Sequence, residues 1–170
     1  MPPRRAASET DKYKQIVESY VAAGGDERVQ QIVTAVHRVS RRLNQWYDRQ
    51  LADLDVSTGE WAVLDELARA GGEALTPSRL AEAAGVAPSS MTHRLDGMVQ
   101  RGMVTREADP DNRTRVLVRL ADPGWQLFAT SIQQADIVES EVLAGLTDTQ
   151  RRTLAQLLER LLTNLDATDV

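Results

Sequence analysis

A polar segment from Glu107 to Arg115 contains the residues best suited to bind a negatively charged partner. A guanidinium at the tip of a turn can reach the narrow, negatively charged minor groove of DNA without a rigid helix behind it. We therefore predict that Arg113 enters a minor groove, and that Asp111 holds the turn by accepting backbone hydrogen bonds. Arg115 is expected either to contact a phosphate or to pair with Glu107 across two strands.

A second set of polar residues could read the edges of bases. Apolar spacing predicts a helix from Pro88 to about Arg101, with Gly102 as its left-handed cap. Its expected inner face consists of Met91, Leu95, Met98 and Val99. An arginine facing the major groove can donate two hydrogen bonds to guanine, a discrimination of about 1 to 3 kcal/mol. The expected base contacts are Ser89, Ser90, Thr92, His93 and Arg94. Alternatively, Arg94 touches only phosphate or pairs with Asp96 or a neighbouring acid.

The segment before this helix predicts phosphate contacts. Thr76 is a favourable N-cap residue and Pro77 suits the first helical position, so a short helix should run to about Ala84. Hydroxyl groups and first-turn amides suit DNA phosphates. The expected phosphate contacts are Thr76, Ser78 and Arg79.

The elements that position these residues form a recognisable order. Two strand-like segments, Met103 to Arg106 and Val116 to Leu120, flank the polar turn. Together with the two short helices before them, they predict a helix-turn-helix followed by a β-wing. The expected fold is mainly α with this small β-wing, and it should read DNA.

Further helices are predicted on both sides of this reading head. A tail over residues 1–10 should be disordered, and a short helix should run from Asp11 to Ala23. Apolar spacing predicts a long helix from about Asp26 to Leu54. Ser57 and Glu60 have capping-box spacing and open a helix with Trp61, Leu64, Leu67 and Ala68 on its buried stripe.

Two helices should follow the wing. Asp122 as N-cap and Pro123 begin a helix through about Leu143. Its expected inward residues are Trp125, Phe128, Ile132, Ala135 and Val138. A capping box at Thr147 to Gln150 opens a last, leucine-rich helix. The apolar stripes of the first long helix and this last one exceed what one small head could cover, which favours a homodimer over packing within one chain.

Composition limits the other classes of function. The 170 residues include no cysteine, which excludes disulfides, thiolate metal sites and a thiol-based redox sensor. The net charge of the chain is -5. The segment from Arg79 to Arg119, however, contains seven arginines and five acidic residues, so a mildly basic head is expected on an acidic body. The sequence contains no phosphate-binding glycine loop, nucleophile elbow or metal-binding histidine pair, and its best acid pair, Asp109 and Asp111, stands in the turn. We therefore expect a cytosolic protein that is not an enzyme, with no membrane, metal or cofactor.

Four motifs resemble the MarR family of bacterial transcription regulators, over about Val29 to Leu165. They are Ser89-Ser90-Met91-Thr92-His93-Arg94-Leu95, Arg101-Gly102-Met103-Val104, Asp109-Pro110-Asp111-Asn112-Arg113 and Leu120-Ala121-Asp122-Pro123-Gly124. In the family these are the recognition helix, its exit, the wing and the start of a dimerisation helix. The family often has a serine just before the recognition helix, whereas Ala87 stands here, so either Ser89 or Ser90 substitutes or that helix end stays loose until DNA arrives.

The resemblance implies a homodimeric repressor of a pseudo-palindromic operator on double-stranded DNA, relieved by a small aromatic or anionic ligand. The candidate ligand residues are His37, Arg38, Arg41, Trp46 and Trp61, although each also has a structural interpretation, as core tryptophan or solvated helix face. A weaker resemblance is to the branch with urate-responsive regulators, whose tryptophan in the first helix is replaced here by Tyr13 and Tyr20.

The expected organisation has four parts. Residues 1–25 form a tail and an extra helix, 26–56 a dimerisation helix, 57–121 the winged helix-turn-helix and 122–170 the C-terminal dimerisation helices. The alternative function is a winged-helix module for protein interaction or architecture, without a ligand response.

Overall fold

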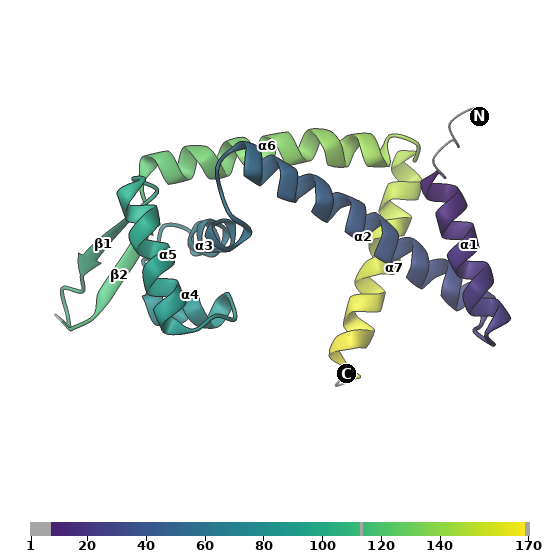
Figure 1. The fold of residues 1–170 in the computed structure, drawn as a ribbon, viewed down its shortest axis with the longest axis horizontal. Helices are drawn as coiled ribbons and strands as arrows, with labels where there is room; N and C mark the ends of the chain where they lie inside the picture. Colours follow the sequence, from purple (N-terminus) through teal and green to yellow (C-terminus); the bar gives the residue numbers. More distant parts are fainter. Residues whose placement is uncertain (1–7, 113, 169–170) are drawn as a thin grey trace, which may run out of the picture. The chain divides into compact units, whose positions relative to one another are not determined.

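The computed structural model describes residues 8–112 and 114–168. The elements run in the order α1 (Glu9–Ala22), α2 (Glu27–Asp53), α3 (Thr58–Arg69), α4 (Pro77–Ala83), α5 (Pro88–Gln100), β1 (Val104–Ala108), β2 (Val116–Leu120), α6 (Asp122–Leu143) and α7 (Asp148–Asp166) (Figure 1). The prediction of a mainly helical fold with one small β-wing is confirmed. Packing divides the chain into two compact units, Met1–Ser57 and Thr58–Val170.

Side-chain caps decide where several helices begin. Thr76 caps α4, its hydroxyl accepting a hydrogen bond from the Arg79 amide at 3.3 Å, and Thr147 and Gln150 form the expected capping box of α7. The prediction for α6 is wrong by one residue: its N-cap is Ala121, which has no side chain to accept a hydrogen bond, and Asp122 is the first helical residue. The acid therefore acts on the positive helix terminus by charge rather than as a cap.

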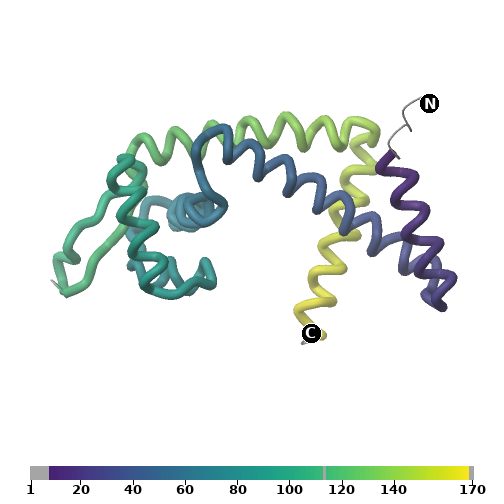
Figure 2. Tube along the Cα trace, viewed as in Figure 1, coloured from purple at the N-terminus to yellow at the C-terminus, as the bar shows by residue number. Residues whose placement is uncertain are grey.

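The helix α1 begins earlier than predicted. Ser8 caps it and Asp11 completes a capping box, so Ser8 to Thr10 do not belong to a disordered tail; the rest of that predicted tail lies outside the described residues. In the N-terminal unit, α1 and α2 run side by side in opposite directions (Figure 2). The Tyr13 hydroxyl joins them by donating to the Gln31 carbonyl at 3.3 Å, and Arg38 pairs with Glu9.

The Glu9 carboxylate predicts a response to acid. Hydrogen bonds from Lys12 and then Arg38 lower the pKa of Glu9 to about 2, from an ordinary 4.5. A carboxyl with a lowered pKa in the folded state stabilises the fold above its unfolded pKa, and this contribution is lost as the pH falls toward the folded value. We expect Glu9→Gln to be less stable than the wild type at pH 6 and equal to it at pH 2, by thermal unfolding. Glu18→Gln, further along the same helix, is the control, and a constant Glu9→Gln difference across the range would show that the pairing is not formed.

The core of the head, defined here as α3, α4, α5 and the β1–β2 sheet, is apolar and closed. Its fully buried large side chains are Val63, Leu64, Leu67, Leu80, Met91, Leu95, Met98, Val104 and Val118. The prediction of Val99 as a core residue is wrong, since its side chain is 39% exposed. Met91, Leu95 and Met98 of α5 already fill the space between the packed elements. Val99 is the next residue after Met98, so the helical turn directs its side chain toward solvent.

The sheet of the head is small and is extended by the α3–α4 loop. Its two strands are antiparallel, with Val104 opposite Leu120 and Ala108 opposite Val116. The first strand begins one residue later and ends two residues later than predicted. Leu75 adds a bridge that the sequence did not indicate, exchanging backbone hydrogen bonds of 3.0 and 2.8 Å with Val118. This bridge fixes the loop before α4 to the sheet.

Two glycines determine how α5 and α6 meet the sheet. Gly102 ends α5 with a φ of 68°, as predicted, and the next amide returns to the Met98 carbonyl at 2.9 Å. There is no room for a side chain at Gly124, in the first turn of α6, because a Cβ there would lie 2.1 Å from the Met103 carbonyl oxygen.

An aromatic contact joins α6 to α3. Trp61 of α3 stacks on Phe128 of α6, with ring centroids 5.3 Å apart.

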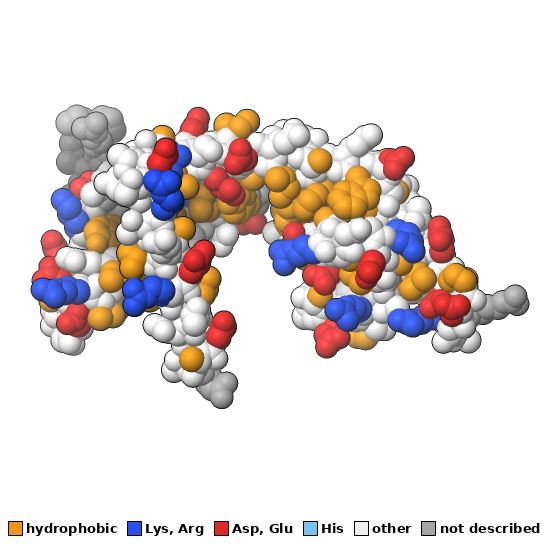
Figure 3. Space-filling view, turned by 180° about the vertical axis from the view of Figure 1, so that it is seen from behind, with side chains coloured by type: hydrophobic (Ala, Val, Ile, Leu, Met, Phe, Trp, Pro, Cys, Tyr) orange, Lys and Arg blue, Asp and Glu red, His pale blue; other side chains and the backbone are white. Residues whose placement is uncertain are grey.

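Large apolar side chains remain exposed on the long helices. They include Val29, Ile32, Val33, Val36 and Val39 of α2 and Leu154, Leu157, Leu158, Leu161, Leu162 and Leu165 of α7. The expectation that Trp125 and Ile132 of α6 point inward is wrong for this single chain, since they are 38% and 47% exposed. Hydrophobic side chains are accordingly visible on the surface in Figure 3. Among the described helices, none is long and apolar enough to cross a membrane.

Candidate nucleic-acid interface

The turn of the wing, defined as residues 109–115 between the two strands, is held by Asp109 rather than by Asp111. The Asp111 amide donates a hydrogen bond to a carboxylate oxygen of Asp109 at 3.0 Å, and Asp109 is buried. Asn112 adds a second local contact by accepting from the Thr114 amide and hydroxyl. Among the described residues, the exposed Asp111 carboxylate accepts none of these bonds, and Asp109 takes the role predicted for Asp111.

Arg115 also pairs differently from the prediction. Its Nη1 lies 3.7 Å from Asp109 Oδ2, and its carbonyl accepts the Asp109 amide at 2.9 Å. Glu107, the expected partner, stands opposite Leu117 instead. The Arg115 side chain is 58% exposed, so it remains available to a phosphate. Arg113, the predicted minor-groove residue, lies outside the described residues.

The outer face of α5 is polar and open, as the sequence predicts. Ser89, Ser90, Thr92 and His93 are all exposed, while Met91 and Leu95 on the opposite face have no exposed surface. Neither serine replaces the missing cap, because the N-cap residue is Ala87 and no side chain caps this helix. The first-turn amides of α5 are therefore left for solvent or for a ligand such as phosphate.

Arg94 turns toward the first turn of α3. A Cβ built on Gly59 would lie 2.5 Å from Arg94 Cζ and Nη2, so the guanidinium occupies the space that a side chain at Gly59 would need. The alternative in which Arg94 pairs with Asp96 is not observed, since Asp96 is bonded to Arg106. Its contact with guanine stays a prediction, and it requires this side chain to leave Gly59.

A polar hollow of about 460 Å³ gathers the predicted phosphate contacts at one edge of the head. Thr76 and Arg79 line it together with Arg115 from the wing, and Ser78 beside them is exposed. Arg69, which sequence reasoning missed, lines the same hollow, although it pairs with Asp65 at 2.5 Å. No motif marks Arg69; it arrives here because α3 ends beside the start of α4.

Three other arginines of the head bond within it. Arg101 pairs with Glu60 at 3.0 Å, Arg106 with Asp96 at 2.5 Å, and Arg119 donates to the Gly72 carbonyl at 2.5 Å. These residues made up part of the charge count that predicted a basic head. In Figure 3, blue basic side chains and red acidic ones are interspersed over the face drawn, with no single basic surface. These three guanidinium groups are therefore less free to reach a phosphate than the count of arginines indicates.

The candidate ligand residues have internal partners or are exposed. Arg38 pairs with Glu9, and Trp46 meets Tyr47 edge-on at 5.4 Å. Trp61 stacks on Phe128, while His37 and Arg41 are exposed on α2. None of these five residues lines the hollow described above.

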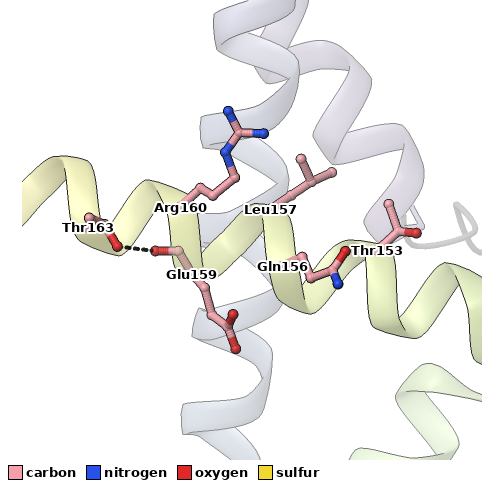
Figure 4. Close-up of a pocket in the computed structure, with 6 residues that line it drawn as sticks. All are labelled: Thr153, Gln156, Leu157, Glu159, Arg160 and Thr163. Carbon is pink, nitrogen blue, oxygen red and sulfur yellow. Dashed lines mark hydrogen bonds between the residues drawn. The ribbon is translucent and has the colours of Figure 1, made fainter.

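A second hollow, also of about 460 Å³, lies on α7. Figure 4 shows its six lining residues, which are Thr153, Gln156, Leu157, Glu159, Arg160 and Thr163. All belong to one helix, so this hollow is a stretch of helix surface rather than an enclosed ligand cavity.

The head thus contains α5, which buries an apolar face and exposes a polar one, and a two-stranded wing. At one edge of the head, arginine and threonine side chains line a polar hollow. This arrangement defines a winged helix-turn-helix domain.

Comparison with known proteins agrees with this class. Residues 52–113 match the model of the MarR family. The regulator PecS of Dickeya dadantii is 26% identical over 130 residues, which cover 76% of this chain and 78% of PecS. Wild-type MarR of Escherichia coli in its apo form superposes with a TM-score of 0.64 at 26% identity, over 75% of this chain and 93% of MarR. A MepR variant of S. aureus bound to an oligodeoxyribonucleotide shares the fold, with a TM-score of 0.63 at 19% identity over 79% of this chain and 97% of MepR.

The chain is similar to transcriptional regulators of the MarR family, through its residues 52–113 and through its winged-helix fold. The relatives it matches are regulators and not enzymes.

Proposed function

We propose that the protein is a homodimeric repressor that binds a pseudo-palindromic operator. The observation that carries this proposal is the two-sided character of α5, in which Met91, Leu95 and Met98 are fully buried while the outer residues from Ser89 to His93 face solvent. Such a helix can lie in a major groove without disturbing the core of the head.

The second copy is proposed from the apolar side chains that the long helices leave in water. The six leucines of α7 are between 38% and 61% exposed, and no residue of this helix is buried. An exposed apolar stripe of this extent indicates an interaction surface. A two-fold dimer would cover it and would place one recognition helix in each half-site of a palindrome.

The first experiment is a gel shift of the purified protein with the DNA upstream of its own gene, at two salt concentrations and with unrelated competitor DNA. A regulator that reads sequence resists the competitor, and its binding weakens with salt because phosphate contacts release counterions. Binding no tighter than to the competitor would favour a distant operator or the alternative, a winged-helix module for protein contacts.

Replacement of Arg113 by alanine is expected to weaken operator binding by about 1 to 3 kcal/mol, the range for one arginine that reads DNA. Folding should be unchanged, because the turn is held by Asp109 and Asn112. Fluorescence anisotropy with a labelled operator measures the affinity, and circular dichroism checks the fold. Arg152→Ala, which removes an exposed charge from α7, is the matched control. Equal affinity of Arg113→Ala and the wild type would exclude the proposed role of Arg113.

We also propose that a small aromatic or anionic ligand releases the protein from DNA, with His37, Arg38, Arg41, Trp46 and Trp61 as its candidate contacts. This part rests on the family resemblance. A ligand can release DNA only if it binds the DNA-incompetent dimer more tightly. Benzoate is a simple probe for this response. Release of bound operator by benzoate, with a reciprocal loss of benzoate affinity when operator is present, supports the proposal. Operator binding that does not change with such probes favours a regulator without this response.

A further inference from the structure

The guanidinium of Arg106 connects the wing to the recognition helix. Arg106 stands on β1, and its Nη1 donates to Asp96 Oδ1 at 2.5 Å while its Nη2 donates to the Thr92 carbonyl at 3.1 Å. Both acceptors belong to α5. The Nε atom of Arg106 is buried and has no hydrogen-bond partner among the described residues, so the side chain lies along the protein. We call this set of contacts the Arg106 brace.

The brace joins the two elements that the proposed function places in different grooves of DNA. Its acceptors, Thr92 and Asp96, lie on α5 among the residues expected at base edges, and its donor lies on the strand that leads into the wing. A planar guanidinium that donates to two acceptors on one element fixes direction as well as distance. The contact therefore limits how α5 and β1 can rotate against each other.

We propose that Arg106 is a positioning residue for DNA recognition, which holds α5 and the wing in the relation that lets both reach DNA together. It does so through the Thr92 carbonyl and Asp96 and does not itself bind phosphate. Only 27% of its side chain is exposed, against 58% for Arg115, which has a longer ion pair. This proposal rests on the DNA-reading function proposed above and adds a residue to it.

Substitution of Asp96 tests the proposal, because the two explanations predict changes of DNA affinity in opposite directions. Asp96 is 50% exposed on the outer face of α5, where an acid repels DNA. If charge alone mattered, Asp96→Asn would tighten binding to every DNA. If the brace matters, Asp96→Asn weakens binding to the selected operator, as Arg106→Gln does.

The test uses the full-length protein and the tightest duplex that the wild type selects from a random library. We expect Arg106→Gln and Asp96→Asn each to weaken binding to this duplex by about tenfold, and the double variant to lose no more than either single one, because the pair acts as one unit. The slope of log affinity against log salt should equal that of the wild type, since no phosphate contact is removed. Arg152→Gln is the control for loss of a positive charge.

Arg106→Lys separates positioning from simple charge. Lysine retains the charge but not the paired donors, so it should behave like Arg106→Gln; a phosphate contact would be largely restored by lysine. A tightening by Asp96→Asn, or a salt slope lowered by about one contact in Arg106→Gln, would overturn the proposal. If Arg106→Gln does not fold, Asp96→Asn decides alone by its sign, because it keeps the bond to Thr92. Failure of the wild type to select any duplex would instead count against the sequence-reading function.

Discussion

Gly124→Ala is expected to destabilise the head by about 1 to 3 kcal/mol or more, the range for overpacked cores. The new Cβ would lie 2.1 Å from the Met103 carbonyl oxygen and 3.2 Å from Leu120 Cδ2. The same carbonyl accepts the Ala121 amide at 3.0 Å, so it cannot move without loss of that hydrogen bond. The backbone fixes the position of a Cβ, and the atom that it would overlap is itself a backbone oxygen. No change of side-chain rotamer can therefore relieve the overlap. Urea unfolding followed by circular dichroism measures the effect.

A matched glycine on α5 gives the control. A Cβ added to Gly97 meets no atom within 4 Å, and this residue lies inside a helix. Gly97→Ala should therefore stabilise the protein by about 0.5 to 1 kcal/mol. If Gly124→Ala unfolded at the same urea concentration as the wild type, the approach of α6 to Met103 would not be present in solution.

The double variant Leu157→Glu with Leu161→Glu is expected to turn the proposed dimer into monomers. These side chains are 52% and 46% exposed in the single chain, so the substitutions leave its interior intact. In a dimer they would place unpaired carboxylates in an apolar contact, which raises the dissociation constant by about a hundredfold or more. Sedimentation velocity measures the change. Operator binding should fall with it, because each monomer reads only one half-site.

The control adds the same two charges to the other face of the helix. Gln156 and Thr163 are exposed on α7 and lie, by helical spacing, away from its leucine stripe, so Gln156→Glu with Thr163→Glu should leave the assembly unchanged. Equal sedimentation of the leucine variant and this control would show that α7 takes no part in a dimer.

The helices and strands could be predicted because their signals are local. Apolar spacing located α2 to within one residue at each end, and the Thr76 and Thr147 caps lie where the sequence places them. The errors come from choices that local rules leave equal. Two acids, Asp109 and Asp111, can each close a turn, and Ala121 becomes the N-cap because α6 begins one residue before Pro123.

The sequence could predict which residues of the candidate site are exposed, but not which contacts they make. Exposure of Ser89, Ser90, Thr92 and His93 follows from the helical period. The partners of the arginines depend on residues far away in sequence, such as Glu60 for Arg101 and Gly72 for Arg119. Charge counting treats all arginines as equal, whereas folding assigns some to hold the head together.

The internal bonds of Arg101, Arg106 and Arg119 also bear on how the proposed repressor would find its operator in a genome. Affinity for random DNA rises with the number of phosphates that a protein neutralises, and a genome offers on the order of a million or more competing sites. With three of its guanidinium groups occupied by its own fold, the head should remain only briefly on each wrong site. Fewer molecules are then held away from the operator, so we expect a small number of copies per cell to keep it occupied.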